Sequence, residues 1–182
     1  MKHILIIVGS LRKESFNRQL AQEIEKVLAH RATVSYLEYG DLPFMNQDIE
    51  YPTPESVARV REDVLRADGI WIVSAEYNFN MPGFLKNLLD WLSRPLIPND
   101  RSRNSAVKGK VVTISGAAGK SAAAGMRKNL KTLLEIMSMK VIGGMGSGIA
   151  MDAESFSSGK LVLSEENKSA IEAQAIALLE AI

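Results

Sequence analysis

The chain contains no cysteine and only two histidines. The lack of cysteine excludes a disulfide framework, a thiolate zinc site, a cysteine nucleophile and a cysteine-ligated iron–sulfur cluster. The histidines, His3 and His30, have no carboxylate or cysteine neighbours at ligand spacing, so we expect no structural or catalytic metal site. A hydrolase would need a nucleophile next to a base. His3 lies in an apolar run and His30 at a helix end, so we do not expect the two histidines to share a site.

Long hydrophobic runs and an excess of one charge are also missing. No apolar run approaches the ~20 residues of a membrane-spanning helix, and the N-terminus lacks the pattern of a secretory signal. The formal net charge is +1, so no strong field attracts nucleic acid or an anionic membrane. We therefore expect a cytoplasmic protein that binds neither nucleic acid nor membrane.

One local cluster of positive charge consists of Arg94, Arg101, Arg103, Lys108 and Lys110. In many nucleic-acid interfaces aromatic side chains alternate with the cations. This cluster has no such aromatic side chains. We therefore interpret the cluster as a solvated surface face.

Five short apolar runs rich in isoleucine and valine predict buried strands. They lie at residues 3–8, 33–37, 69–74, 110–115 and 140–144. Five stripes of apolar residues at helical spacing lie between and after them and begin at Phe16, Val57, Phe84, Met126 and Ile171, with Ser164 as the predicted N-cap of the last helix. Two tryptophans and three methionines also fall on these apolar faces and are expected in the core, namely Trp71, Trp91, Met126, Met137 and Met139.

Strands that alternate with helices of this length predict an α/β fold with a parallel sheet between two layers of helices. For a single domain of residues 1–182, we expect a three-layer flavodoxin-like sandwich with five strands in the order 2-1-3-4-5. This order places ligands beyond the carboxyl ends of strands one and three, at residues 9–15 and 75–82.

The first of these two loops has the composition of a phosphate site. It follows the first strand and opens the first helix, where backbone N–H groups are unpaired and the helix dipole is positive. Ser10, Ser15 and Asn17 add side-chain donors, and Arg12 can supply charge. The alternative is an ordinary turn with Ser15 as the N-cap. A phosphorylated cofactor is the ligand that this loop favours.

The second loop combines a carboxylate, a phenol, amides and apolar side chains. Glu76, Tyr77, Asn78, Phe79 and Met81 all lie within it. This mixture suits a flat heteroaromatic ligand, which is stacked on its faces and hydrogen-bonded at its edge. Alternatively, the apolar members pack between helices or against a second subunit.

Both loops resemble the NADPH-dependent FMN reductase family, which includes quinone, azo-dye and chromate reductases. Residues 9–17 are similar to the family's GSLRxxSxN phosphate loop. Residues 76–91 are similar to its EYNxxxPGxLKNxxDW segment. Beyond Ser115 the similarity lies in the pattern of strands and helices rather than in motifs.

The resemblance implies FMN as the cofactor and NADPH or NADH as the co-substrate. It implies that the FMN phosphate is held by Ser10, Arg12, Ser15, the backbone N–H of Phe16, and Asn17. Glu76, Tyr77, Asn78 and Phe79 would border the isoalloxazine ring, and Ser115 and Gly116 would close the far side of the pocket. Hydride would pass from the nicotinamide through flavin N5 to a small electron acceptor in a ping-pong cycle, with no catalytic side chain.

The resemblance also bears on partners. We expect a homodimer or homotetramer in which Phe79, Met81 and Phe84 contact a second subunit. The acceptor would be a quinone, an azo compound, a metal oxyanion or free flavin. A cation near the ribose 2′-phosphate would favour NADPH; Arg101 and Arg103 are candidates, although a solvated loop is the preferred interpretation.

Two other functions stay open. A flavodoxin-like electron carrier would bind FMN without oxidising NAD(P)H, but such carriers are usually strongly acidic and this chain is near neutral. A nucleotide-binding phosphohydrolase is suggested by residues 116–121, which end in Gly-Lys-Ser but are two residues too short for a phosphate-binding P-loop.

Overall fold

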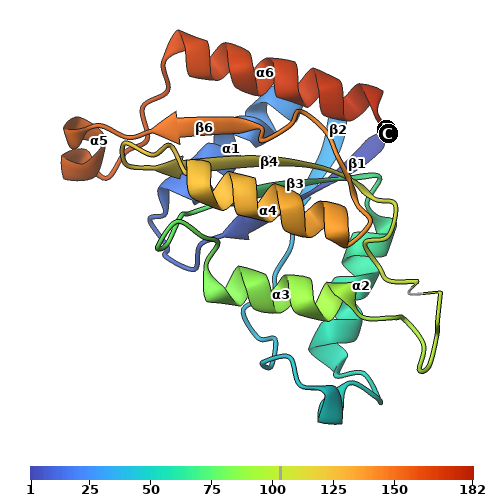
Figure 1. Ribbon diagram of the computed structural model, residues 1–182. Helices are drawn as coiled ribbons and strands as arrows, with labels where there is room; N and C mark the ends of the chain where they lie inside the picture. The colour runs from blue at the N-terminus through green and yellow to red at the C-terminus, as the bar shows by residue number, and fades with distance from the viewer. Residues whose placement is uncertain (103) are drawn as a thin grey trace.

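The computed structural model describes residues 1–102 and 104–182, in which a parallel sheet lies between two layers of helices (Figure 1). Arg103 of the basic cluster lies outside the described residues. The strands of this part are β1 (Lys2–Gly9), β2 (Ala32–Tyr36), β3 (Gly69–Ser74), β4 (Val111–Ala118), β5 (Lys140–Val141) and β6 (Ser147–Ala150). The main order, β2-β1-β3-β4-β5, confirms the predicted flavodoxin-like topology.

The helices occupy the positions that the apolar stripes predict. They are α1 (Phe16–Leu28), α2 (Glu55–Arg66), α3 (Gly83–Ser93), α4 (Ala124–Ile136), α5 (Ala153–Ser158) and α6 (Glu165–Glu180), with a short 3₁₀ turn η1 (Gln47–Ile49). Ser15 and Ser164 are the N-caps of α1 and α6, as expected. The short α5 and η1 are not predicted by the sequence pattern.

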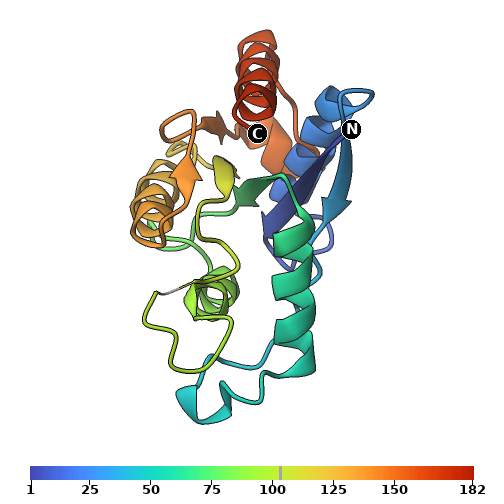
Figure 2. The same ribbon diagram turned by 90° about the vertical axis from the view of Figure 1, so that its right-hand side faces the viewer.

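The side chains of alternate residues in the central strands pack into two separate cores, one on each face of the sheet. Leu5 and Ile7 of β1 pack with α2, α3 and α4, whereas Ile4, Ile6 and Val8 pack with α1 and α6. Figure 2 shows this arrangement nearly end-on, with α6 and α1 on one side of the sheet and α2, α3 and α4 on the other. The run of apolar residues in β1 therefore reflects burial on both faces rather than an edge strand.

The prediction of one strand over residues 140–144 is wrong. β5 ends at Val141, and a new strand, β6, pairs with the carboxyl half of β4. Gly143, Gly144 and Gly146 separate the two strands with φ of 70°, 63° and 63°, a conformation that favours glycine. A Cβ atom on Gly146 would overlap the carbonyl of Ile114. The glycines thus break one strand and let the chain return to the sheet further along β4.

The interpretation of the basic cluster as a solvated face is wrong for two of its members. Arg94 donates two hydrogen bonds of 2.9 Å to the buried carboxylate of Glu50. The ammonium of Lys110 donates to the carbonyls of Leu65 and Ala67 at 2.8 and 2.7 Å. These two cations hold loops to the helical layer, whereas Arg101 is exposed.

Among the described residues, no helix is both long and apolar enough to span a lipid bilayer. Trp71, Trp91 and Met126 are fully buried, and Met139 is nearly so. Met137 is partly buried and packs against the core. The expectation that these side chains belong to the core is confirmed.

Candidate functional site

The carboxyl ends of β1, β3, β4 and β6 meet at one edge of the sheet, on the left-hand side of Figure 1. A pocket of about 230 Å³ lies there. It is lined by Ser10, Arg12, Ser15, Phe16, Asn17, Ala75, Glu76, Tyr77, Ala117, Ala118, Gly119, Met151 and Phe156. The structure therefore brings the two predicted loops together at the switch point of the sheet.

One end of the pocket is the N-terminus of α1. Ser10 and Ser15 are buried, and the hydroxyl of Ser15 accepts a hydrogen bond of 3.2 Å from the backbone N–H of Asn17. The guanidinium of Arg12 lies 5.5 Å from the centre of the Phe16 ring. No acidic residue lies in the first turn of α1. Hydroxyls, a guanidinium and helix N-terminal amides, with no acid in the first helical turn, fit a phosphate group.

The side chain of Asn17 bridges α1 and β4. Its Nδ2 donates to the carbonyl of Ala117 at 3.0 Å, and its Oδ1 accepts from the N–H of Ala117 at 2.8 Å. Asn17 is buried and lines the pocket, but both polar atoms of its amide are already used by the protein. Its observed contacts hold the end of β4 against the start of α1.

The second loop makes a tight turn beside the pocket. Tyr77 and Asn80 exchange two backbone hydrogen bonds of 2.8 and 3.0 Å. The central residues, Asn78 and Phe79, have φ of 51° and 62°, as in a type I′ turn. Tyr77 lines the pocket, whereas Asn78 and Phe79 lie outside its lining. The ring of Phe79 is 75% exposed.

The carboxylate of Glu76 is directed toward the start of α4. It accepts hydrogen bonds from Ser121 Oγ at 2.6 Å and from the N–H of Met126 at 2.8 Å. Burial alone would raise the pKa of Glu76, but these bonds, a further one from the Gly125 N–H and the charge of Arg127 outweigh it and lower this pKa below its usual value. Glu76 therefore fixes the β4–α4 connection that borders the pocket.

Ser115 and Gly116 do not line this pocket. The hydroxyl of Ser115 is buried between Trp71 Nε1, which donates to it at 3.0 Å, and Gln174 Oε1, which accepts from it at 3.3 Å. A side chain at Gly116 would clash with Met126 and Ala123 on the α4 side. β4 runs three residues past Ser115, so residues 117–119 line the pocket instead.

Two lining residues, Met151 and Phe156, come from a segment that the sequence pattern did not identify. Met151 follows β6, and its N–H donates to the carbonyl of Ala118 at 2.8 Å. Phe156 lies on α5 and meets Phe16 edge-on, with ring centres 5.7 Å apart. Neither residue belongs to a recognisable motif, so only the pairing of β6 with β4 reveals their position.

The Gly-Lys-Ser sequence at residues 119–121 is not arranged as a phosphate loop. Ala117 and Ala118 before it are paired to β6 within the sheet. The hydroxyl of Ser121 donates to Glu76 and accepts from the N–H of Ala123 at 3.3 Å. Ser121 is thus used in the turn before α4, which argues against the phosphohydrolase alternative.

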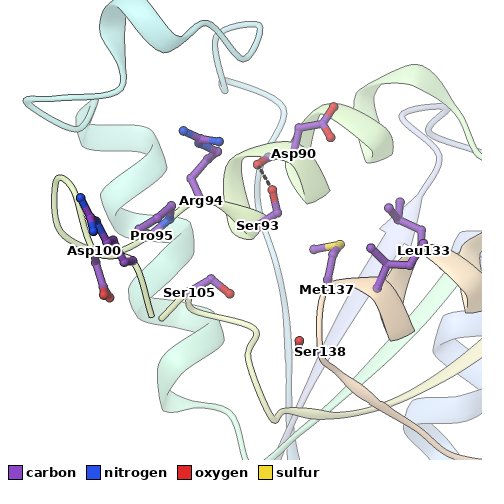
Figure 3. Close-up of a pocket in the computed structure, with 11 residues that line it drawn as sticks. Asp90, Ser93, Arg94, Pro95, Asp100, Ser105, Leu133, Met137 and Ser138 are labelled. Atoms are coloured by element: carbon purple, nitrogen blue, oxygen red, sulfur yellow. Dashed lines mark hydrogen bonds between the residues drawn. The ribbon is translucent and has the colours of Figure 1, made fainter. Parts of the chain in front are cut away.

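A second and larger hollow, of about 720 Å³, lies at the C-terminal ends of α3 and α4 (Figure 3). Its acidic and basic groups are largely engaged within the protein. Asp90 accepts from Lys86 at 2.6 Å, and Arg94 is bonded to Glu50. Since it is remote from the carboxyl ends of the strands, we assign the candidate cofactor site to the smaller pocket.

Residues 2–154 match the NADPH-dependent FMN reductase family. The chain belongs to this family. A 2-hydroxy-1,4-benzoquinone reductase from a Burkholderia species is 42% identical over 92 residues, which are 50% of each chain. This match therefore spans about half the length of that curated relative.

Two further members of the comparison cover nearly the whole chain. An NAD(P)H-dependent FMN reductase of Pseudomonas aeruginosa is 28% identical over 177 residues, which are 96% of this chain and 92% of that protein. The structure of FerB, a flavoenzyme NAD(P)H:(acceptor) oxidoreductase from Paracoccus denitrificans, superimposes with a TM-score of 0.85 at 29% identity. That superposition covers 99% of this chain and 96% of FerB. Membership of the FMN reductase family thus accounts for the fold.

Proposed function

We propose that this protein is an FMN-dependent NAD(P)H oxidoreductase that reduces small acceptors. One observation carries the proposal. The acid-free N-terminus of α1, with Ser10, Arg12 and Ser15, opens into the same pocket as Tyr77 of the second loop. A phosphate seat next to an aromatic platform suits a flavin mononucleotide.

The residues divide between the two ends of the ligand. Ser10, Arg12, Ser15 and the backbone N–H of Phe16 would hold the phosphate, and Tyr77 would border the ring. When bound, FMN supplies the redox chemistry by accepting a hydride from NAD(P)H and passing reducing equivalents to the acceptor. The protein binds and orients the reactants, so no side-chain nucleophile or general base is required.

A quinone is the acceptor that we propose first. Several relatives that match about half of this chain are named as quinone reductases. Tyr77 lines the pocket and is 54% exposed, so a planar acceptor would have access to this end of the pocket. The proposal extends to other small acceptors, including azo compounds, metal oxyanions and free flavin.

We also propose that the protein forms a homodimer or homotetramer. Phe79 is 75% exposed, and the half-buried Met81 and Phe84 lie close to it in the sequence. Exposed apolar side chains often mark a subunit contact. Analytical ultracentrifugation tests this proposal, and a monomer with undiminished FMN affinity would contradict it.

Titration of flavin-free protein with FMN is the first test of the proposed activity. We expect quenching of flavin fluorescence with 1:1 stoichiometry, loss of the yellow colour on addition of NADPH or NADH, and its return with a quinone. An electron carrier would bind FMN but would not oxidise NAD(P)H directly. A folded protein that takes up no FMN would contradict both functions.

A further inference from the structure

One wall of the pocket comes from residues 151–161, within the connection between β6 and α6 and outside the two loops described above. Figure 1 shows α5 of this segment at the end of the β6 arrow, beside the edge where the pocket lies. The helix has six residues, and its N-cap is Asp152, whose carboxylate accepts from the Ser155 N–H at 2.8 Å. So short a helix is marginal alone, and its position depends on external contacts.

The segment contacts the phosphate end of the pocket through Phe156. Its ring meets Phe16 edge-on, and Phe16 in turn lies beneath the guanidinium of Arg12. Phe156 is 56% exposed, so it covers the pocket from the outside rather than filling the core. Arg12, Phe16 and Phe156 therefore form one contiguous wall around the first turn of α1.

The side chain of Gln19 on α1 makes two hydrogen bonds to this segment. Gln19 Nε2 donates to the carbonyl of Gly159 at 2.9 Å, and Gln19 Oε1 accepts from the N–H of Leu161 at 2.8 Å. Both bonds join α1 to residues about 140 positions later in the chain. Gln19 lies one turn after the N-cap Ser15, so the clamp is attached to the same helix end that forms the phosphate seat.

We propose that Gln19 is a positioning residue that acts through Phe156 to shield the phosphate seat from water. The proposal rests on the function proposed above. By fixing residues 159–161, Gln19 holds Phe156 against Phe16. Exclusion of water lowers the local dielectric and strengthens charge-assisted hydrogen bonds to the phosphate. The wall then favours a flavin that carries a phosphate over one that ends in the ribityl hydroxyl.

The test compares FMN with riboflavin in four proteins: wild type, Gln19→Ala, Phe156→Ala and the double variant. Dissociation constants are measured by flavin fluorescence at two salt concentrations. We expect each single change to weaken FMN binding roughly five- to tenfold, from the loss of about 1 kcal/mol of aromatic contact and hydrogen bonding. Riboflavin binding should change less than twofold, and the salt dependence of FMN binding should increase.

The double variant tests whether Gln19 acts through Phe156. If it does, the two losses are not additive, and the double variant binds FMN about as well as Phe156→Ala alone. Gln22→Ala is the matched control because Gln22 lies on the exposed side of the same helix. Hydrogen exchange gives an independent readout without flavin, since the Leu161 amide should exchange faster in Gln19→Ala but not in Gln22→Ala.

Three results would overturn the inference while leaving the proposed function intact. These are unchanged FMN binding in Gln19→Ala and Phe156→Ala, equal losses for FMN and riboflavin, or fully additive losses in the double variant. Absence of FMN binding by the wild-type protein would overturn the function and the inference together. If Gln19→Ala does not fold, the exposed Phe156→Ala and Phe156→Leu pair still decides whether the wall discriminates between the flavins.

Discussion

The two loops that form the pocket differ in how they use their polar side chains. In the first loop, Ser10 and Arg12 face the pocket, and only Asn17 is committed to a distant strand. In the second loop, the single carboxylate, Glu76, is committed to the start of α4, while Tyr77 remains to border the pocket. Each loop thus contributes one side chain that holds a neighbouring element and at least one other that faces the pocket.

This difference shows that a functional motif contains two kinds of residue. Asn17 bonds to Ala117 of β4, and Glu76 bonds to the turn that follows the same strand. The loops are therefore fastened to β4 from two sides. A substitution at either fastening residue should reduce stability and ligand affinity together, whereas one at a residue that faces the ligand should reduce affinity alone.

The largest effect is expected for Asn17→Ala. It removes two hydrogen bonds and leaves the buried N–H and C=O of Ala117 without their partners. The free energy of unfolding should fall by about 2–4 kcal/mol, because unsatisfied buried polar groups are costly. Urea denaturation measures this change, with Arg18→Ala of the same helix as the control. A loss below 0.5 kcal/mol would show that the bridge is dispensable.

Glu76→Ala should have the second largest effect on stability, about 1–2 kcal/mol, because it removes a carboxylate from the N-terminus of α4. The pH dependence provides a sharper test. Since the folded-state pKa of Glu76 is lowered, its contribution is present above the usual value of 4.5 and is lost as the pH falls through the folded-state pKa.

The difference in unfolding free energy between the wild type and Glu76→Gln should therefore shrink on acidification below the usual glutamate pKa. Thermal unfolding at a series of pH values follows this change. A difference that stays constant down to the acid limit would mean that the charge of Glu76 has no part in holding α4. The Glu14→Gln variant is the control, because Glu14 is exposed.

Arg12→Ala should separate affinity from stability. Arg12 is exposed, so the free energy of unfolding should change by less than about 0.5 kcal/mol. FMN binding should weaken roughly tenfold or more, while riboflavin binding stays nearly unchanged, since the guanidinium is proposed to hold the phosphate. Fluorescence titration with both flavins checks this, and Lys13→Ala is the matched control. Equal losses for the two flavins would refute the assignment of Arg12 to the phosphate.

The smallest effect is expected for Phe79→Gly, and it has the opposite sign. Phe79 has a φ of 62°. This conformation is unfavourable for a residue with a Cβ atom but not for glycine. The variant should be stabilised by up to about 1 kcal/mol, as measured by thermal unfolding, with Tyr77→Ala as a comparison from the same turn. If the protein is destabilised instead, the exposed ring contributes contacts that outweigh the strain.

The sequence predicts most of the fold because apolar periodicity and burial agree in its central elements. β3 matches the predicted residues 69–74, and the caps at Ser15 and Ser164 follow from local hydrogen bonding. The split of the fifth strand could not be predicted from apolar content. It depends on three glycines with positive φ and on the pairing of β6 with β4, which is a contact between distant residues.

The sequence predicted which two loops border the candidate pocket, but not what each side chain in them does. Turn chemistry and the switch point identify both loops, but they do not distinguish the fastening role of Asn17 from the exposed position of Arg12. The turn at Asn78 and Phe79 could not be predicted from the sequence either, since a phenylalanine with positive φ is uncommon. Phe156 lies in a serine-rich segment without periodicity, and only tertiary contacts place it at the pocket.

The lining of the pocket is drawn from positions 10 to 156, almost the full span of the polypeptide. A ribosome releases these parts in order, and the early sheet can begin to form before the late wall has left the exit tunnel. Cofactor loading would therefore be one of the last events in the maturation of the protein. Nascent chains arrested before Phe156 should retain flavin poorly, even when their central strands have already assembled.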